Sequence, residues 1–305
     1  MNFIKNYFLA ARPSFLTLTL LGCAIGYFGG SSTGETKWAI NFLAILIALL
    51  AHASGNVLND YFDHLNGSDS INSERISPYT GGSRFIQSNI FSPKEILQFG
   101  LLLLIVASLL GLCLCYLSTW LLLPIGILGL ILLWIYSAPP LKLMSRGLAG
   151  EIAIAASWSL IVIGFATLQS NHINLALIPT AAAFGFMVAN ILFLNQIPDI
   201  NADRNSQKFT LASKSRPEKL WLWYIFFVLT SYVLQIIAVY WNLASSQTLL
   251  TILAAPFFAF CAIKLRKGEL NYLNMKTMIP VNIAGVHLYG VLICAGLMAS
   301  SKFLF

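Results

Sequence analysis

The chain has 305 residues, of which 58% are hydrophobic and only 10% are charged, and its mean hydropathy is +0.77. About a quarter of the residues in a soluble globular domain are charged, so this composition excludes an ordinary soluble enzyme and indicates an integral membrane protein. The formal net charge is +7, yet the basic residues follow membrane topology, and we expect no nucleic-acid partner.

Nine apolar segments recur along the chain, each long enough or nearly long enough to cross about 30 Å of hydrocarbon as a helix. In chain order they are 14–30, 38–60, 95–117, 119–136, 150–169, 174–196, 219–241, 247–264 and 280–299. No linker rich in Pro, Gly or Ser divides them. We therefore expect an all-α, polytopic membrane protein with nine transmembrane helices in one domain over 1–305.

The basic residues predict the orientation of these helices. With nine spans, sixteen of the eighteen Lys and Arg residues lie on the side of the N-terminus, and only Lys37 and Lys302 lie opposite. Ten of the eleven acidic residues share that side, and Glu35 is the exception. By the positive-inside rule the side of the N-terminus is cytoplasmic, so the polar connections are expected to face the cytoplasm.

The first acidic cluster lies where the second predicted span ends. Asn56, Asn59, Asp60 and Asp63 are spaced at i, i+3, i+4 and i+7, so they share one face of a helix. Asp69 follows an Asn-Gly-Ser run, which favours a turn and can return its carboxylate toward that face.

The second acidic cluster lies where the sixth predicted span ends. Asn195, Asp199 and Asp203 are spaced at i, i+4 and i+8, again on one face if the helix continues. Pro198 interrupts that helix, because proline lacks a backbone N–H and disfavours helical geometry at Ile197. We expect a kink there, with Asp203 on a short helical continuation outside the membrane.

The two clusters give the chain a weak internal symmetry. The second span ends in Asn59-xxx-Asp63, and the sixth span, four spans later, ends in Asn195-xxx-Asp199. This pattern predicts two pseudo-repeated four-helix units whose acidic ends face each other, plus one extra helix. Repeats related in this way place a site at their interface.

The residue types in both clusters indicate a site for Mg²⁺ and an anion. Five of the eleven acidic residues lie there, although a carboxylate costs about 2.5–3.5 kcal/mol at the centre of a membrane helix. Carboxylate and amide oxygens are the ligands that Mg²⁺ prefers, and Mg²⁺ recruits substrate phosphates. The simplest use of both clusters is to hold a diphosphate through Mg²⁺. The alternative is that these Asp residues only cap or solvate helix ends.

Three basic elements are expected on the same side. Thr80-Gly-Gly-Ser-Arg84 is a glycine-rich turn whose N–H groups and Arg84 side chain can bind phosphate oxygens. Tyr136 and Lys142 flank a double proline at the end of the fourth span, and Lys208 follows the second cluster. The alternative for these residues is an interfacial tyrosine and two lysines that only set the topology.

Taken together, these motifs resemble the UbiA superfamily of intramembrane prenyltransferases. The resemblance rests on Asn59-Asp60-xx-Asp63, Tyr136-Ser-Ala-Pro-Pro-Leu-Lys142, and Asn195-xxx-Asp199-xxx-Asp203-Arg204 with Lys208-Phe-Thr-Leu-Ala. It implies helices around a central cavity, with two Mg²⁺ ions holding a polyprenyl diphosphate under a cytoplasmic cap. It also implies a multi-pass protein of the bacterial inner membrane, in contact with membrane lipid.

The resemblance assigns roles to individual residues. The implied metal ligands are Asn59, Asp63, Asp69, Asp199 and Asp203. The implied substrate-binding residues are Asn56, Asn59, Asp60, Arg84, Asn195 and Lys208. The implied catalytic residues are Asp63, Asp199, Asp203, Lys142 and Tyr136, with Arg84 and Lys142 resembling diphosphate contacts.

Within the superfamily the chain looks most like the 1,4-dihydroxy-2-naphthoate polyprenyltransferases of menaquinone synthesis. The runs Tyr79–Arg84 and Arg146–Glu151 and the spacing of Asp69 carry this likeness. Gln196-Ile-Pro198 departs from the Asn-Asn-x-Arg common there, so 4-hydroxybenzoate, homogentisate and chlorophyll-type acceptors stay as alternatives.

The implied reaction is transfer of a polyprenyl group from its diphosphate to an aromatic acceptor. Aromatic side chains can shield the allylic cation through their π faces, and Phe62, Phe193 and Trp158 are the candidates. Two other functions use the same residues: a terpene cyclase, in which the substrate's own double bond is the nucleophile, and a lipid-diphosphate carrier.

Overall fold

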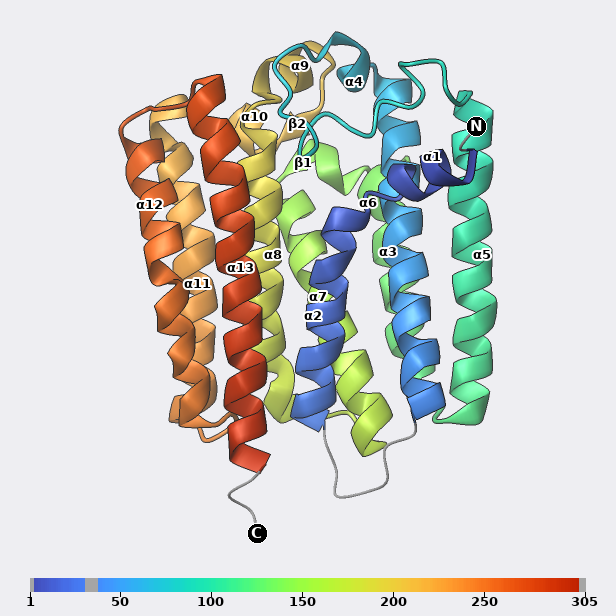
Figure 1. The fold of residues 1–305 in the computed structure, drawn as a ribbon, viewed down its shortest axis with the longest axis vertical. Coiled ribbons are helices and arrows are strands. Elements are labelled where there is room, and N and C mark those ends of the chain that lie inside the picture. Colours follow the sequence, from blue (N-terminus) through green and yellow to red (C-terminus); the bar gives the residue numbers. More distant parts are fainter. Residues whose placement is uncertain (1–2, 31–37, 302–305) are drawn as a thin grey trace.

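The computed structural model describes residues 3–30 and 38–301, and long helices that run side by side dominate it (Figure 1). Lys37, Lys302 and Glu35, which the sequence places on the far side, lie outside the described residues.

The long helices are α2 (Pro13–Gly30), α3 (Trp38–Asn66), α5 (Pro93–Leu117), α6 (Leu122–Ser137), α7 (Ala149–Ser170), α8 (Ile178–Gln196), α11 (Leu220–Tyr240), α12 (Ala255–Arg266) and α13 (Tyr272–Ser301). The short helices are α1 (Phe3–Ala10), α4 (Ser68–Ile71), α9 (Ile200–Asn205) and α10 (Leu211–Lys214). The 3₁₀ turns are η1 (Leu143–Ser145), η2 (Leu175–Leu177), η3 (Pro217–Lys219) and η4 (Ser246–Ala254), and the strands are β1 (Arg146–Gly147) and β2 (Phe209–Thr210).

Each predicted span coincides with a helix in the described part of the chain when the adjoining 3₁₀ turns are counted, and two boundaries differ by six residues or more. The second span continues past residue 60 to Asn66, so Asn56, Asn59, Asp60 and Asp63 lie on one unbroken helix, whereas Asp69 lies beyond it on α4. The last span begins at Tyr272 rather than at 280, and Pro280 lies inside it. The side chain of Asn271 accepts a hydrogen bond from the Asn274 N–H at 2.9 Å and caps this earlier start.

The number of membrane crossings is the point on which the sequence and the structure differ most. Over the described residues, 8 helical segments are long and apolar enough to span a membrane, with η2, η3 and η4 continuing into α8, α11 and α12. The remaining predicted span, α6, is equally apolar but has only 16 residues. The all-α, polytopic membrane architecture is therefore confirmed, whereas the exact count of nine is not.

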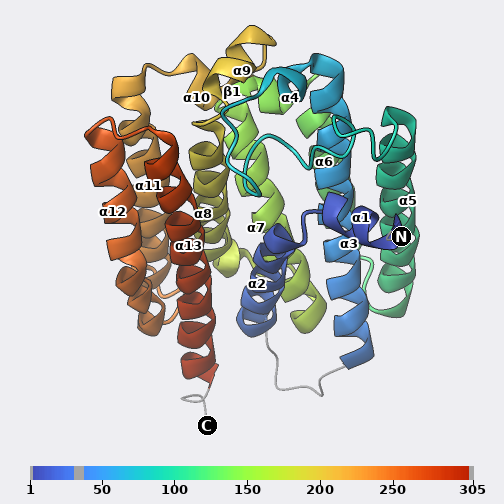
Figure 2. The same cartoon turned by 45° about the horizontal axis from the view of Figure 1, so that its top comes forward.

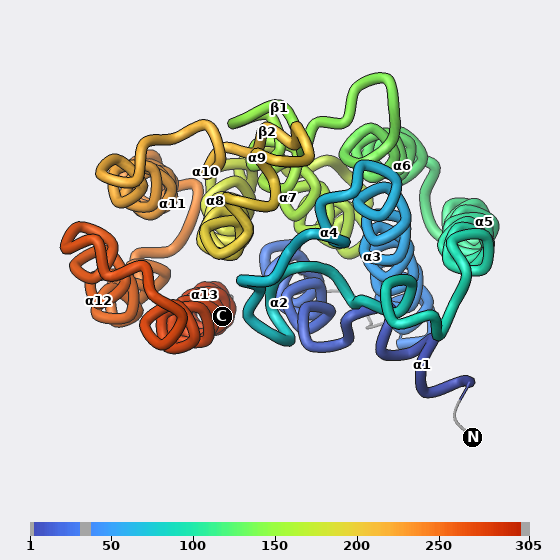
Figure 3. The backbone as a smooth tube through the Cα atoms, turned by 90° about the horizontal axis from the view of Figure 1, so that it is seen from above, coloured from blue at the N-terminus to red at the C-terminus, as the bar shows by residue number. Residues whose placement is uncertain are grey.

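The helices form a bundle with a cap at one end. Seen from the cap side, α11, α12 and α13 form one side, α3, α5 and α6 form the other, and α2, α7 and α8 lie between them (Figure 3). The cap contains α4, α9, α10 and the two short strands (Figures 1 and 2). The helices that carry the two acidic clusters, α3 and α8, therefore both end beneath this cap.

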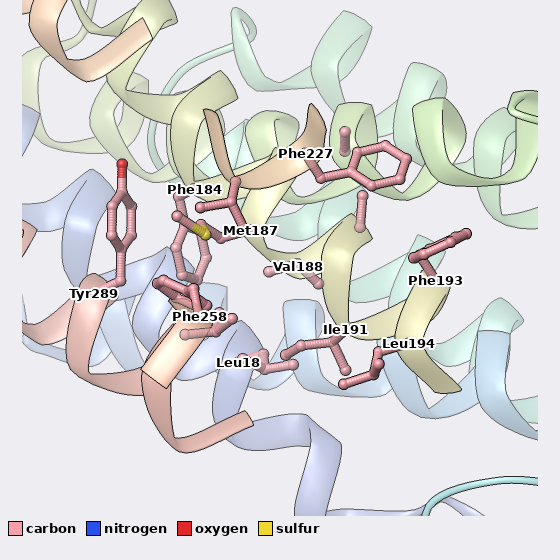
Figure 4. Close-up of a cluster of buried hydrophobic side chains, with 14 of the residues drawn as sticks. Leu18, Phe184, Met187, Val188, Ile191, Phe193, Leu194, Phe227, Phe258 and Tyr289 are labelled. Atoms are coloured by element: carbon pink, nitrogen blue, oxygen red, sulfur yellow. The ribbon is translucent and has the colours of Figure 1, made fainter. Parts of the chain in front are cut away.

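The largest hydrophobic core surrounds α8, which is apolar on all sides and mostly buried (Figure 4). Phe184 and Phe193 on this helix are fully buried, and Phe227 of α11 packs against Phe193. Glycines let the neighbouring helices approach closely. A Cβ at Gly185 would lie 2.2 Å from the Ala155 carbonyl oxygen of α7, so only glycine fits there.

The cap is tied together by contacts between segments that are distant in the sequence. The strand β1, between α6 and α7, pairs in parallel with β2, between α9 and α10, in the register Arg146 to Phe209 and Gly147 to Thr210. Asn201 of α9 also donates a hydrogen bond to the Glu74 carboxylate at 3.0 Å. The two polar connections that follow the acidic clusters are thus parts of one structure.

Candidate active site

A cavity of about 650 Å³ begins beneath the cap and extends between α2, α3, α5, α6, α7 and α8. Its polar lining at the cap end consists of Arg12, Asn56, Asn59, Asp63, Asp69, Asn72, Thr80, Asn195, Gln196, Asp199, Asp203, Lys208 and Thr210. Further along α3 the lining becomes apolar and reaches Ala44, roughly 28 Å from Asp63 at the rise of an α-helix. One end of the cavity thus suits an anion, and the rest suits a hydrocarbon chain.

The first cluster reaches the cavity from α3 and the turn after it. Asn56, Asn59 and Asp63 line the cavity as their spacing predicts. Gly67 takes a left-handed conformation, with φ 83°, and α4 then brings Asp69 to the same end. A Cβ at residue 82 would lie 2.3 Å from a carboxylate oxygen of Asp69, so this close packing requires a glycine there.

The second cluster reaches the cavity from the end of α8 and from α9. The helix stops at Gln196, and α9 begins at Ile200, which places the predicted break at Pro198. Asn195, Asp199 and Asp203 all line the cavity. The Asp199 carboxylate accepts hydrogen bonds from the Asn72 side chain at 2.7 Å and from the Gly81 N–H at 3.2 Å.

Lys208 lies between the two clusters. Its ammonium group is 2.9 Å from the Asp63 carboxylate and 3.9 Å from that of Asp203. Burial alone lowers the pKa of Lys208, but the carboxylates of Asp63 and Asp203 outweigh it and raise the pKa above its ordinary value. The lysine is therefore a permanent positive charge that connects the two acidic helix ends.

The remaining carboxylates are crowded and poorly hydrated. Burial raises the pKa of Asp69 to about 7, and the negative charges of Asp63 and Asp60 add to that shift. Burial likewise raises the pKa of Asp203 to about 7, against the opposing effect of Lys208. Any additional positive charge that enters the cavity therefore lowers the electrostatic free energy of the ionised carboxylates.

Asp60 is the member of the first cluster that the structure keeps out of the cavity lining. Its carboxylate pairs with the Arg12 guanidinium and accepts the Ser83 N–H at 3.2 Å. Arg12 itself lines the cavity, although its place just before the first apolar segment is equally consistent with a residue that only sets the membrane topology. Asp60 thus acts on the site by orienting Arg12.

Arg84 and Lys142 are also absent from the cavity lining over the described residues. The Arg84 guanidinium donates to the backbone carbonyl oxygen of Asp69, so it supports the turn that presents this carboxylate. Lys142 is exposed, with a left-handed backbone at φ 44°. Tyr136, which precedes it at the end of α6, does line the cavity.

Three polar side chains to which the sequence assigned no role of their own belong to the site, although Thr80 and Thr210 lie within its motifs. Asn72 and Thr80 line the cavity beside Asp199, and Thr210 donates to an Asp203 carboxylate oxygen at 3.1 Å. They lie in connections without helical periodicity, so no spacing rule could identify them. The glycines that follow Thr80 were the available signal.

The walls of the cavity contain one of the three aromatic residues expected there. Trp158 of α7 lines it, together with His52 of α3, whose Nδ1 lies 2.8 Å from the Thr19 hydroxyl. Phe193 is instead buried in the core around α8, and Phe62 is absent from the lining over the described residues (Figure 4).

The residues at the cap end fit Mg²⁺ by their chemistry. In the described structure no three His, Cys, Asp or Glu side chains are close enough together to hold an ion unaided. Two oxygens that line the cavity end, Oδ2 of Asp69 and Oδ1 of Asn195, are nevertheless buried without a hydrogen-bond partner. Mg²⁺ is commonly held by one or two carboxylates plus the phosphates of a substrate. The site therefore suits an ion that arrives with an anionic ligand.

Comparisons with known proteins agree with this geometry. The chain matches the UbiA prenyltransferase family over residues 16–277. It is 31% identical over 221 residues to a 1,4-dihydroxy-2-naphthoate octaprenyltransferase from Haemophilus influenzae, a match that covers 68% of each chain. It is 26% identical over 296 residues to the protein of the same name from Escherichia coli, covering 95% of this chain and 94% of that one.

A solved structure shares the fold. The structure of a UbiA homolog from Archaeoglobus fulgidus bound to GPP and Mg²⁺ superposes with a TM-score of 0.64 and 15% sequence identity, covering 95% of this chain and 99% of that chain.

Proposed function

We propose that this chain, which belongs to the UbiA prenyltransferase family, transfers a polyprenyl group from a polyprenyl diphosphate to 1,4-dihydroxy-2-naphthoate. The reaction requires Mg²⁺ and serves menaquinone synthesis in this proposal. The whole of 1–305 acts as one domain, with the cap on the cytoplasmic side of a bacterial inner membrane.

The observation that carries the proposal is the division of the cavity into two parts. Four carboxylates, Arg12 and Lys208 surround its cap end, whereas its length along α3 is apolar. A polyprenyl diphosphate has the same division, with an anionic head and a hydrocarbon tail. A carrier would share the head-group site, but the family is one of transferases.

The cap end binds and orients the diphosphate. Arg12 and Lys208 supply fixed positive charges that favour the leaving diphosphate as negative charge develops on it. Asp63, Asp69, Asp199 and Asp203, with Asn59, are the residues that would hold two Mg²⁺ ions. When bound, Mg²⁺ would add positive charge at the leaving group and offset the repulsion between these carboxylates and the diphosphate.

The apolar part of the cavity excludes water from the reacting carbon. Trp158 and Tyr136 line it and can stabilise an allylic cation through their π faces. Exclusion of water matters because water would otherwise capture the cation before the aromatic ring attacks. The electron-rich acceptor ring then forms the new C–C bond, and loss of its carboxyl group restores aromaticity.

The choice of acceptor is supported by the names of the relatives rather than by contacts. Proteins named 1,4-dihydroxy-2-naphthoate octaprenyltransferase match from 56% to 95% of the chain. The Archaeoglobus fulgidus homolog bound to GPP and Mg²⁺ supports the same head-group chemistry.

The experiment that tests the proposal is an acceptor panel. Purified protein in detergent or nanodiscs is given Mg²⁺, a radiolabelled polyprenyl diphosphate, and 1,4-dihydroxy-2-naphthoate, 4-hydroxybenzoate or homogentisate. We expect lipid-soluble labelled product with the naphthoate and none when EDTA replaces Mg²⁺.

Each other outcome of the panel has a defined meaning. If product forms only with 4-hydroxybenzoate or homogentisate, the naphthoate is not the acceptor, but the proposed prenyl transfer reaction still holds. Lipid-soluble product without any acceptor would indicate a cyclase, and labelled diphosphate bound without turnover would indicate a carrier.

A further inference from the structure

A buried polar pair joins α7 to α8 directly beneath the cap. The Gln196 side chain donates from Nε2 to a carboxylate oxygen of Glu151 at 2.8 Å. Glu151 is fully buried, and Gln196 is 8% exposed. Gln196 lines the cap end of the cavity and Glu151 does not, and neither is among the residues that the motifs assign to Mg²⁺ or the diphosphate.

Gln196 uses both ends of its amide. While Nε2 donates to Glu151, Oε1 accepts the backbone N–H of Ala212 at 3.2 Å. Ala212 is the second residue of α10, so the amide connects two membrane helices to the cap. Among uncharged side chains an amide suits this position because it offers a donor and an acceptor together.

The segment that Gln196 holds is the one that presents Asp203 and Lys208. Thr210 caps α10 by accepting the Ser213 N–H, and its hydroxyl donates to Asp203. The Lys208 N–H donates to the Asp203 carbonyl oxygen at 2.8 Å. A shift of α10 away from α8 would therefore move the carboxylate and the ammonium group together.

The hydrogen-bonded pair of Glu151 and Gln196 is not explained by a contribution to the stability of the fold. Oε2 of Glu151 is buried and has no hydrogen-bond partner among the described residues. An unpaired buried polar atom costs about 1–3 kcal/mol, and two apolar side chains of similar volume would avoid that cost. The polar pair is therefore better explained by the placement of the cap than by packing.

We infer that Gln196 and Glu151 are positioning residues that set the place of Asp203 and Lys208 relative to α3, and so set the affinity for Mg²⁺ and diphosphate. This inference rests on the proposed head-group site and is independent of which acceptor is used.

Two isosteric substitutions and their combination test this inference. Glu151→Gln keeps an oxygen that can accept from Gln196, so it should behave like the wild type. Gln196→Glu loses the hydrogen bond to Glu151 and places two carboxyl groups against each other, so the side chain that holds Ala212 should shift and the KM for the diphosphate should rise about tenfold. The double variant supplies an amide donor at 151 for the carboxylate at 196, which still accepts the Ala212 N–H, so Glu151→Gln should rescue Gln196→Glu to within about threefold of wild type.

A binding measurement that needs no acceptor accompanies the kinetics. Mg²⁺ with geranyl diphosphate should raise the melting temperature of the wild type, of Glu151→Gln and of the double variant. The rise should be smaller for Gln196→Glu at the same concentrations. If the wild type shows no rise at all, the proposed head-group site fails rather than the positioning role.

Three results would overturn the positioning role. One is Gln196→Glu with unchanged KM and unchanged ligand-induced melting shift. Another is a double variant no better than Gln196→Glu alone. The third is a defect confined to the KM for the aromatic acceptor, which would make Gln196 an acceptor contact. Glu151→Gln is expected to fold normally. If Gln196→Glu misfolds on its own, the deciding measurement is whether the double variant recovers the wild-type KM for the diphosphate.

Discussion

The two acidic clusters look alike in the sequence but are positioned in different ways. In the first, Asn56, Asn59 and Asp63 lie on one unbroken helix, so their mutual geometry follows from the helix itself. In the second, the helix stops before Asp199, whose carboxylate is held by hydrogen bonds from residues of the cap. The first half of the site is thus set locally, and the second half depends on tertiary contacts.

Because of this difference, we expect different kinds of substitution to disrupt binding at the two acidic clusters. The first half should be lost mainly when a ligand is removed, because α3 itself holds Asn56, Asn59 and Asp63 on one face. The second half can also be lost when a residue that touches neither Mg²⁺ nor substrate stops holding the cap in place. The predictions below use this contrast, from the largest expected effect to the smallest.

Removing a carboxylate from either cluster should have the largest effect. Asp63→Ala, Asp199→Ala and Asp203→Ala should each reduce turnover by more than about a hundredfold, because each removes a ligand from one shared, charge-balanced site. Activity is measured with saturating substrates, and correct insertion is checked by monodisperse elution in detergent. Glu218→Ala is the control, since this carboxylate is exposed and is not part of the cavity lining. Near-normal turnover in two of the three alanine variants would refute the shared site.

The contrast between the halves also explains what could be predicted from the sequence. The helices follow from apolar segments of membrane-spanning length, and the family and enzyme class inferred from the motifs are confirmed by the family match. Spacing at i, i+3, i+4 and i+7 predicted one helix face for Asn56, Asn59, Asp60 and Asp63, and of these all but Asp60 line the cavity. Their roles as ligands stay predictions.

The contacts that complete the site could not be predicted in the same way. Asn72 and Thr210 belong to irregular connections, where no periodicity links one residue to a distant carboxylate. Arg12 could be read as topology because its partner, Asp60, is far away in the sequence. The length of α6 was also overestimated, because residues 119–121 are apolar in composition but precede the helix.

Lys208 should give the next largest effect because it contacts both halves. Lys208→Met should leave the carboxylates of Asp63 and Asp203 facing each other without a cation and lower the melting temperature in EDTA by several degrees. Mg²⁺ should then stabilise this variant more than it stabilises the wild type. The measurement is a thermal melt with and without Mg²⁺.

A lysine in a half-buried ion pair outside the cavity lining provides the control for Lys208. Lys264 pairs with Glu269 at 2.6 Å, away from the cavity. Lys264→Met should change the melting temperature little and leave the response to Mg²⁺ unchanged. An equal response in both variants would mean that Lys208 has no special place between the clusters.

Thr210 tests the dependence of the second half on a supporting hydrogen bond. Thr210→Val removes the donor to Asp203 and should raise the KM for the diphosphate about tenfold, the consequence of about 1.4 kcal/mol. Thr210→Ser keeps the hydroxyl and should stay near the wild type. The KM for the acceptor should not change in either variant, and equal defects in Val and Ser would assign the effect to packing.

Arg84 and Lys142 should show the smallest effects, and they separate the sequence-based expectation from the structure. Both were expected to contact the diphosphate, yet Arg84 donates to the Asp69 carbonyl oxygen and Lys142 is exposed. Arg84→Gln should therefore raise the KM for the diphosphate only a few-fold, by loosening the turn that presents Asp69. Lys142→Gln should stay within about twofold, as expected for an exposed charge screened by water. Steady-state kinetics with the diphosphate as the varied substrate measure both. If Lys142→Gln has the larger effect, the connection after α6 must move onto the bound diphosphate, and the direct contact inferred from the motif would be restored.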